Sequence, residues 1–504
     1  MWRLNRRTLA PVSPALSEPE DKGFRKLPEK VLQFGEGNFL RAFVDWMIHK
    51  LNREGLFRGR VVVVQPLPEG RAEDLNEQDG LYTLILCGYR EGKLEEEREV
   101  ISSISRALNA YTQWEEVLAC AANPELEFII SNTTEAGISY DPEDRPELTP
   151  PRSFPGKLTA FLYRRYEHFK GDPQRGLVIL PCELIDRNGD NLRNIVLRLA
   201  REWGLPGAFS EWVEEHNLFL NTLVDRVVPG YPRDRAEKLE RELGYKDKLM
   251  VVGELFHLWV IEGPEEIKER LPLHRAGLNV IWTQDLGPYR TRKVRILNGI
   301  HTATAAAAFL AGVDTVREAV EHPLWGNFME EAIFSEIIPS VDLDEDMLKT
   351  YAREVLERFR NPHIIHYWQS ILLNTTSKYR TRVLPSVIGY WEKKGNLPVR
   401  LVFSLAALAY LFKEGQMSGR NFTGRRSKGE FNLEDDPEAL KFWQQAWQRY
   451  DGTPGSLREV AACILKRSDI WGEDLTSLPG LADLLSRHLK DIIDNGVEEA
   501  AKKL

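Results

Sequence analysis

The chain has 504 residues, 42% of them hydrophobic and 28% charged, and its net charge is -9 at pH 7. This length exceeds what one hydrophobic core usually serves, so two or more domains are expected, and the acidic balance argues against a nucleic-acid partner. The four cysteines are scattered without metal-ligand spacing, and the longest apolar run is shorter than the roughly 20 residues that a membrane crossing needs. We therefore expect a globular cytoplasmic protein without signal peptide, membrane segment, structural zinc or disulfide framework.

The first clear element is a short apolar strand at residues 31–34, followed by a turn with Gly35 and Gly37 and then an amphipathic helix. A second apolar strand at 61–64 closes a βαβ unit of about the ~30 residues that such a unit takes. Glycines at this turn let the backbone approach a pyrophosphate, and the start of the helix offers free amides. Leu40 replaces the third glycine of the usual pattern, so an ordinary tight turn is the alternative.

The second strand ends at Gln65, where a typical NAD enzyme carries an acidic residue that holds the ribose hydroxyls. Without that carboxylate, rejection of the 2′-phosphate of NADP is less secure. No arginine follows Val64 directly to receive a 2′-phosphate. NAD is therefore the expected cofactor.

The remaining pattern divides the chain into two parts. Further strands are expected at 82–87, 126–130 and 177–181, and helices at 110–122 and 153–166. Beyond Asp285, long amphipathic helices dominate, at 297–311, 343–358, 399–412 and 440–448. We predict an α/β Rossmann-type NAD-binding domain over 1–285, followed by a mainly α-helical substrate and catalytic domain over 286–504. A stretch rich in Gly, Ser and Arg at 415–436 is predicted to be a surface loop.

One segment of the second part carries residue types suited to ketone reduction. Lys293, Asn298 and His301 are spaced i, i+5 and i+8, which falls within about 140° of arc on an α-helix. Reduction of a ketone needs a proton donor and hydrogen-bond donors around the carbonyl oxygen, and these side chains can supply both. Three arginines share the segment, so a solvated basic helix start is the alternative.

Four motifs taken together resemble the long-chain mannitol dehydrogenase family, and the similarity runs from about residue 30 to 410. The motifs are GEGNFLRAF at 35–43, SNTTEAG at 131–137, VDR at 224–226 and the Lys293-x4-Asn298-x2-His301 spacing. The resemblance implies a Rossmann-type domain, a helical domain, a zinc-independent active site between them, and Lys293 as the general acid/base.

The same resemblance implies roles for further residues. Asn298 and Asn188 would stabilise the oxyanion, His301 would orient a substrate hydroxyl, and Glu135 would relay the proton of the catalytic lysine through water. The implied cofactor-binding residues are Gly35, Gly37, Asn38, Phe39, Gln65, Asn132 and Thr133. No metal is expected.

Within the family, the segments at 132–140, 181–186 and 231–234 look most like members that act on a hexuronate. A uronate carboxylate calls for cations, and Lys378 and Arg382 are the candidates, with Asp225 in the polar shell of the substrate; solvated surface charges are the alternative. The expected reaction is NAD-dependent interconversion of D-tagaturonate and D-altronate in galacturonate breakdown. The D-fructuronate/D-mannonate pair, a polyol, and a nucleotide-sensing binding protein without catalysis are the alternatives. The sequence predicts a small sugar acid as the binding partner. It does not indicate the oligomeric state.

Overall fold

The computed structural model describes residues 2–8, 26–90, 92–134 and 137–504. The chain divides into two compact units, Met1–Leu286 and Gly287–Leu504. The first is an α/β unit built on a parallel sheet and the second is mainly α-helical, which confirms the predicted fold class. None of the helices in the described ranges combines the length and the hydropathy that a membrane crossing would need.

The first unit alternates strands and helices along most of its length. Its elements are β1 Trp2–Arg3, β2 Glu29–Phe34, α2 Asn38–Arg41, α3 Val44–Arg53, β3 Arg60–Gln65, α4 Ala72–Glu77, β4 Tyr82–Arg90, β5 Lys93–Ile101, β6 Ile104–Asn109, α5 Trp114–Ala119, β7 Phe128–Ser131, α6 Phe154–Phe169, β8 Val178–Pro181, α7 Asn188–Glu202, α8 Gly207–His216, β9 Leu218–Phe219, β10 Asn221–Asp225, α9 Ala236–Leu243, β11 Tyr245–Lys246, β12 Val251–Glu254, β13 Leu258–Glu262, α10 Glu266–Arg270 and β14 Val280–Thr283.

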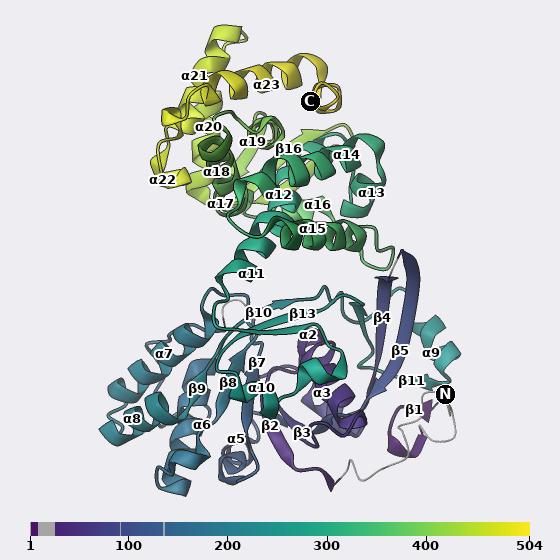
Figure 1. The fold of residues 1–504 in the computed structure, drawn as a ribbon, viewed down its shortest axis with the longest axis vertical. Coiled ribbons are helices and arrows are strands. Elements are labelled where there is room, and N and C mark those ends of the chain that lie inside the picture. The colour runs from purple at the N-terminus through teal and green to yellow at the C-terminus, as the bar shows by residue number, and fades with distance from the viewer. Residues whose placement is uncertain (1, 9–25, 91, 135–136) are drawn as a thin grey trace. The chain divides into compact units, whose positions relative to one another are not determined.

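A six-stranded sheet forms the centre of this unit (Figure 1). Its strand order is β6-β3-β2-β7-β8-β9, and each neighbouring pair runs parallel. The winding reverses between β2 and β7, and doubly wound sheets bind their ligands at such a switch point, outside the carboxyl ends of the strands. A ligand site is therefore expected where β2 and β7 end.

Both faces of the central sheet are buried. In β3, Val61 and Val63 belong to one hydrophobic cluster and Val62 and Val64 to another, and all four are at most 1% exposed. Helices α5 to α8 pack on the second face, and α3 packs on the first (Figure 1). Burial on both faces explains the unbroken apolar run that predicted a parallel strand here.

Strand β4 confirms the element predicted at 82–87, but it does not join the central sheet. It pairs antiparallel with β5 and parallel with β12 in a separate three-stranded sheet. β5 begins Lys-Leu-Glu-Glu-Glu-Arg-Glu, and these residues are exposed or half-buried. Because an edge strand can carry charges on both faces, its sequence lacks the apolar alternation that marks a strand.

The second unit is built mostly of helices. Its elements are α11 Gly287–Arg292, the π-helical turn η5 Lys293–Asn298, α12 Gly299–Leu310, α13 Val316–Glu321, α14 Pro323–Glu331, the π-helical turn η6 Ala332–Ile337, α15 Glu345–Phe359, α16 Trp368–Ile371, α17 Thr375–Arg382, α18 Leu384–Lys394, α19 Val399–Leu411, β15 Gly415–Ser418, β16 Asn421–Arg426, β17 Gly429–Glu434, α20 Pro437–Trp447, α21 Pro454–Leu465, α22 Ser468–Trp471, α23 Leu481–Asn495 and α24 Val497–Ala501.

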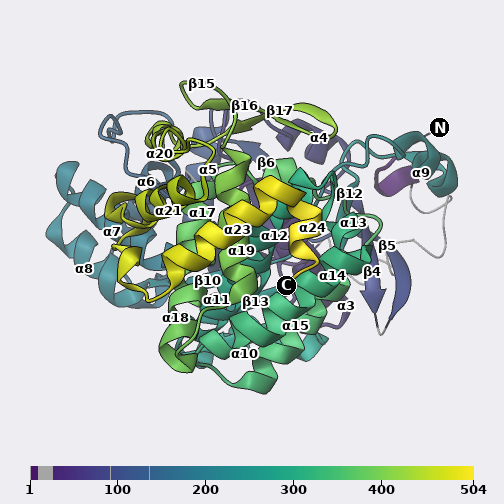
Figure 2. The ribbon, with the colours of Figure 1, turned by 90° about the horizontal axis from the view of Figure 1, so that it is seen from above.

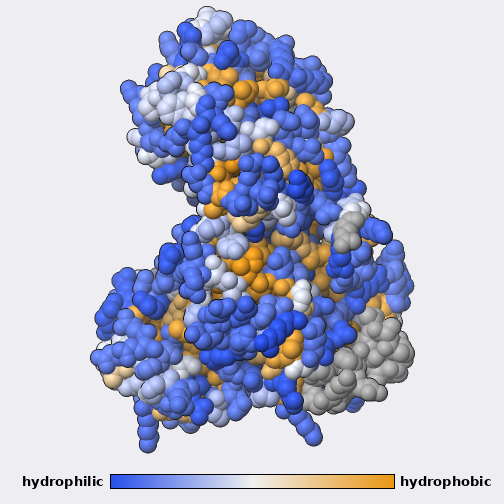
Figure 3. Space-filling model, viewed as in Figure 1, coloured by the Kyte–Doolittle hydropathy of each residue, from blue (hydrophilic) through white to orange (hydrophobic). Residues whose placement is uncertain are grey.

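Helix α12 lies at the core of the second unit. Its residues 303–309 are at most 2% exposed, so it is surrounded on all sides. Its neighbours include α14, α16, α17, α19 and α24, and α23 packs along α19 (Figure 2). The face drawn in Figure 3 is mostly hydrophilic, with apolar residues showing in smaller patches.

The prediction of a surface loop at 415–436 is wrong. The segment forms a three-stranded antiparallel sheet of β15, β16 and β17. Phe422, Phe431 and Leu433 are at most 5% exposed and hold this sheet against the helices. The strands are short, and glycines and charged residues separate their few apolar positions, so composition alone predicted irregular structure.

Asp45 of α3 is a buried carboxyl tied to the end of β2. Gln33 Nε2 donates to the carbonyl oxygen of Gly35 at 3.0 Å and to Asp45 Oδ2 at 3.1 Å. Desolvation outweighs this hydrogen bond and raises the pKa of Asp45 to about 7. The glycine turn is therefore linked to a carboxyl group that stays protonated up to about pH 7.

We expect part of the free energy of unfolding to be lost as the pH rises through about 7, because unfolded aspartate has a pKa of about 3.9 and the folded state binds the proton more tightly. This contribution is complete below the unfolded pKa, and each pKa unit corresponds to about 1.4 kcal/mol. Asp45→Asn should flatten the pH dependence of the free energy of unfolding in urea titrations between about pH 4 and about pH 7. The exposed Asp234→Asn is the control, and an unchanged pH dependence in Asp45→Asn would contradict the expectation.

Candidate functional site

The glycine turn lies at the switch point of the central sheet. Gly35 has a φ of +115°, and a Cβ atom there would lie 2.6 Å from the carbonyl oxygen of Asn132, the residue after β7. The Gly35 N–H donates to the carbonyl oxygen of Val64 at 2.9 Å. The Asn132 N–H donates to the carbonyl oxygen of Phe34 at 3.1 Å. The ends of β2, β3 and β7 are thus joined at a position that only glycine fits.

Gly37, in contrast, faces open space. Among the described residues, no heavy atom would lie within 4 Å of a Cβ atom built there. The next two residues are tied to α2 and α3: Asn38 Oδ1 accepts from Arg41 at 2.8 Å, and the ring of Phe39 stacks on Phe43 with centroids 5.0 Å apart. The turn therefore leaves its backbone accessible to a ligand, as a pyrophosphate site requires.

The segment after β7 is held by a buried carboxylate, Glu183, that the sequence pattern did not reveal. Glu183 is 2% exposed, and its Oε1 accepts from the backbone N–H of Thr133 at 2.9 Å and from the Thr133 hydroxyl at 3.0 Å. Its Oε2 accepts from the Ser131 hydroxyl at 3.0 Å. Desolvation raises its pKa in spite of these bonds. Its place directly after an apolar strand was the available signal, because carboxylates there lie at the ligand edge of the sheet.

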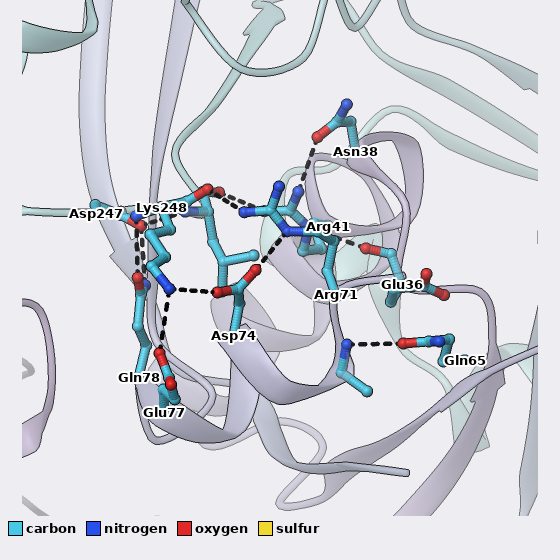
Figure 4. Close-up of polar contacts among 12 residues, drawn as sticks. Glu36, Asn38, Arg41, Gln65, Arg71, Asp74, Glu77, Gln78, Asp247 and Lys248 are labelled. Carbon is cyan, nitrogen blue, oxygen red and sulfur yellow. Dashed lines mark hydrogen bonds and ion pairs between the residues drawn. The ribbon is translucent and has the colours of Figure 1, made fainter. Parts of the chain in front are cut away.

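Gln65 braces the loop that follows β3. Its Nε2 donates to the carbonyl oxygens of Leu67 and Pro68 at 2.9 and 3.1 Å. Its Oε1 accepts from the N–H of Ala72 at 3.0 Å, the dashed line drawn at Gln65 in Figure 4. The side chain is 2% exposed. This geometry gives Gln65 a structural role, and its contact with a cofactor stays a prediction.

Asn188 and Asp225 are both buried in the first unit. Asn188 begins α7, and its Nδ2 donates to the carbonyl oxygens of Pro181 and Glu183 at 3.0 and 3.1 Å. Its Oδ1 accepts from the N–H of Thr222 at 2.9 Å. With its amide hydrogens directed at backbone carbonyls, this geometry favours a structural role, and oxyanion stabilisation by Asn188 stays a prediction. Asp225 ends β10 and is 5% exposed.

Lys293, Asn298 and His301 lie on one continuous helix, in which α11, η5 and α12 follow one another directly. Because η5 is a π-helical turn, its hydrogen bonds join residues five apart, so Lys293 and Asn298 lie nearly one full turn apart on the same face. An α-helix would separate them by about 140°. Glu135, the predicted proton relay, lies outside the described residues.

His301 is enclosed by aromatic rings. Its imidazole stacks on Phe359 with centroids 4.3 Å apart, and it meets His366 and Trp368 edge-on at 5.9 and 6.2 Å. Burial lowers the pKa of His366. This packing fixes the plane of the His301 ring, as a residue that orients a substrate hydroxyl requires.

Two of the three arginines beside Lys293 pack into the second unit. The Arg292 guanidinium lies 4.3 Å from the ring centroid of Tyr351. Arg295 donates from Nε to Ser386 Oγ at 2.7 Å and from Nη2 to Ser340 Oγ at 3.0 Å, and burial lowers its pKa to about 10. These contacts do not fit the alternative of a solvated basic helix start.

Lys378 and Arg382 lie one turn apart on α17 and share a face of that helix. The end of α17 packs against the start of α12, because a Cβ atom on Gly299 would lie 3.1 Å from the carbonyl oxygen of Arg382. Lys378 Nζ donates to the carbonyl oxygen of Ile371 at 2.9 Å. The structure thus brings the end of α17 beside the start of α12, next to the segment that bears the candidate residues Lys293 and Asn298.

The sheet of β15 to β17 anchors the start of α17. Asp435 is 1% exposed, and its Oδ2 accepts from the N–H and the hydroxyl of Thr376 at 3.0 and 2.8 Å. The Asn374 N–H donates to the carbonyl oxygen of Glu434 at 2.8 Å, and Arg420 donates to Asn374 Oδ1 at 3.0 Å. The segment predicted to be a loop therefore positions the helix that bears the candidate cations.

Two family models match the chain. One, described as the mannitol dehydrogenase Rossmann domain, matches residues 29–275, and the other, the mannitol dehydrogenase C-terminal domain, matches residues 285–493. Among relatives, the altronate oxidoreductase of Bacillus subtilis (strain 168) is 47% identical over 480 residues, covering 95% of this chain and 96% of that protein. The altronate oxidoreductase of Escherichia coli O6:K15:H31 (strain 536 / UPEC) is 45% identical, covering 95% of this chain and 97% of that protein.

Two solved structures share the fold along nearly the whole chain. The mannitol 2-dehydrogenase of Pseudomonas fluorescens, in a ternary complex with NAD and D-mannitol, has a TM-score of 0.73 at 24% identity, covering 99% of each chain. A D-sorbitol dehydrogenase in substrate-free form has a TM-score of 0.80 at 23% identity, also covering 99% of each chain.

Gly35→Ala and Gly37→Ala make a matched pair that tests the glycine turn. The methyl group added at Gly35 would meet the Asn132 carbonyl, so we expect a loss of stability of about 1 to 3 kcal/mol. The free energy of unfolding of Gly37→Ala should lie within about 0.5 kcal/mol of that of the parent. Its affinity for NADH should be about tenfold weaker, because the added methyl group occupies the open face of the turn. Urea unfolding and fluorescence titration measure both; parental NADH affinity in Gly37→Ala would rule out this face as the dinucleotide site.

Proposed function

Since the chain belongs to the mannitol dehydrogenase family, we propose that it is an NAD-dependent dehydrogenase that interconverts D-tagaturonate and D-altronate. The sugar acid is proposed because relatives that match almost the whole chain carry the name altronate oxidoreductase. In this proposal the enzyme acts in galacturonate breakdown in the cytoplasm. The nicotinamide cofactor is supported by the Rossmann strand order and by the open glycine turn at its switch point.

The observation that carries the catalytic proposal is the π-helical turn η5. It places Lys293 and Asn298 on one face, so an ammonium and an amide can reach the same substrate oxygen. His301 follows within one further turn and is held by its aromatic neighbours. A binding protein without catalysis would have no need for a proton donor and an amide at matched positions.

The chain's own residues would then act on the ketone as follows. When bound, NADH supplies the hydride that adds to the carbonyl carbon. As the C=O bond becomes an alkoxide, Lys293 Nζ gives a proton to the oxygen, and it takes the proton back in the reverse direction. Asn298 donates a hydrogen bond to the developing negative charge, and His301 orients a neighbouring hydroxyl.

The proposal for a uronate rests on the cations of α17. Lys378 and Arg382 share one face of α17, whose end lies beside the start of α12. A polyol or ketose substrate carries no carboxylate for these cations to pair with. A charge-assisted hydrogen bond to a carboxylate contributes about 1.5 to 3 kcal/mol.

The substrate assignment is tested by comparing D-tagaturonate, D-fructuronate and D-fructose in parallel assays of NADH loss. We expect the highest kcat/KM for tagaturonate. Arg382→Gln should raise the KM for tagaturonate about tenfold to a hundredfold and leave the kinetics with fructose unchanged. Arg380→Gln, an exposed position on the same helix, is the matched control. Equal or greater turnover of fructose by the parent enzyme would contradict the uronate proposal. A preference for fructuronate would identify the enzyme as acting on the D-fructuronate/D-mannonate pair.

Lys293→Ala tests the acid/base assignment. We expect kcat to fall about a hundredfold to ten-thousandfold, because proton transfer in the transition state loses its donor. NADH binding, measured by fluorescence titration, should stay within about twofold, because Lys293 acts on the sugar oxygen. Arg290→Ala, an exposed neighbour on α11, should retain activity. Substantial turnover in Lys293→Ala would show that another group moves the proton.

A further inference from the structure

A carboxylate from the glycine turn lies close to the end of β3. Gln65 ends β3, and a Cβ atom on Gly70, in the loop beyond it, would collide with Glu36 Oε1 and would lie 2.5 Å from Gln65 Cδ. Glu36 therefore reaches from the end of β2 to the loop after β3, as Figure 4 shows. The absence of a side chain at Gly70 makes room for this carboxylate.

Glu36 is partly buried at this position. Burial raises the pKa of its carboxyl, and the backbone of Glu36 itself and of Arg71 lies near enough to oppose this rise. The carboxylate is thus part of the turn and not a solvated surface charge. Its position matters because dinucleotide-binding folds hold the adenosine ribose at the end of the second strand, where an acidic residue accepts from the ribose hydroxyls.

We infer that Glu36 is the residue that selects NAD over NADP in this chain, in place of the carboxylate that β3 lacks. It accepts a hydrogen bond from the free 2′-hydroxyl of the adenosine ribose and repels a 2′-phosphate. This inference rests on the proposed function, because it assumes that a nicotinamide dinucleotide binds at the glycine turn.

The cations beside this carboxylate have other partners. Arg71 is paired with Asp74 through Nε at 2.8 Å, and its Nη2 donates to the carbonyl oxygen of Lys248 at 2.6 Å (Figure 4). Arg41 is 4% exposed and donates to the carbonyl oxygen of Leu249. A 2′-phosphate, with a charge of about -1.5 to -2 near pH 7, would meet a carboxylate before it could draw either guanidinium away from these partners.

Titration of the full-length enzyme with NADH and with NADPH, without any sugar, tests the inference by binding alone. We expect the parent to bind NADPH at least about a hundredfold more weakly than NADH, and Glu36→Gln to narrow this ratio at least about tenfold. Glu36→Asp keeps the charge and should keep the preference. Competition against NADH by 5′-AMP should be stronger than competition by adenosine 2′,5′-bisphosphate in the parent, and Glu36→Gln should narrow this difference as well. This result would assign the effect to the adenosine ribose.

Glu69→Gln is the matched control, because Glu69 is an exposed carboxylate on the same loop after β3. An unchanged NADPH/NADH affinity ratio in Glu36→Gln would overturn the inference, and an altered ratio in Glu69→Gln alone would assign the selectivity to that residue instead. Thermal melts of each variant separate selectivity from unfolding, and if Glu36→Gln unfolds, Glu36→Ala replaces it with the same expectation. A parent that binds neither dinucleotide would overturn the cofactor assignment itself, whereas failure of the sugar assays alone would leave this inference standing.

Discussion

The candidate dinucleotide site depends on a steric constraint at the centre of the parallel sheet. Gly35 approaches the carbonyl oxygen of Asn132 so closely that no side chain fits between them. This contact joins the strand ends on either side of the switch point, and the hydrogen bond to Val64 adds the third strand. Gln33 extends the constraint inward to Asp45, so the position of the turn is set by the core of the unit.

The parts of the fold that could be predicted were those whose local sequence carries a clear apolar pattern, either a continuous run or a regular period. The apolar runs at 31–34 and 61–64 are buried on both faces, so each strand was visible without knowledge of its neighbours. The strand β5 was hidden by its charges, because an edge strand needs no apolar face. The sheet of β15 to β17 was hidden for another reason. Its buried side chains are Phe422, Phe431 and Leu433, and three apolar positions are too few to form a recognisable period.

At the candidate site, residue types could be predicted, whereas their orientations could not. The sequence placed Gln65 at the end of a strand, but its amide is satisfied by carbonyl oxygens of a loop whose fold no local pattern indicates. Asn188 is similar, since its partners at 181 and 183 become apparent only when β8 and α7 are assembled. Glu183 and Glu36 lie within segments that were recognised in the sequence, and only contacts across neighbouring strand ends distinguish them from surface charges.

The π-helical turn at Lys293–Asn298 makes the length of this stretch as important as its composition. Removal of a single residue would let the helix close into regular α-turns, and α12 would still be buried among its neighbours. Each residue of an α-helix advances the side chains by about 100°, so the same deletion, made between Lys293 and Asn298, would leave them four residues and about 40° apart, still on one face of the helix. The five-residue spacing and the π-helical turn are therefore matched to one another, because regular α-helical winding of the same residues would turn Lys293 and Asn298 about 140° apart.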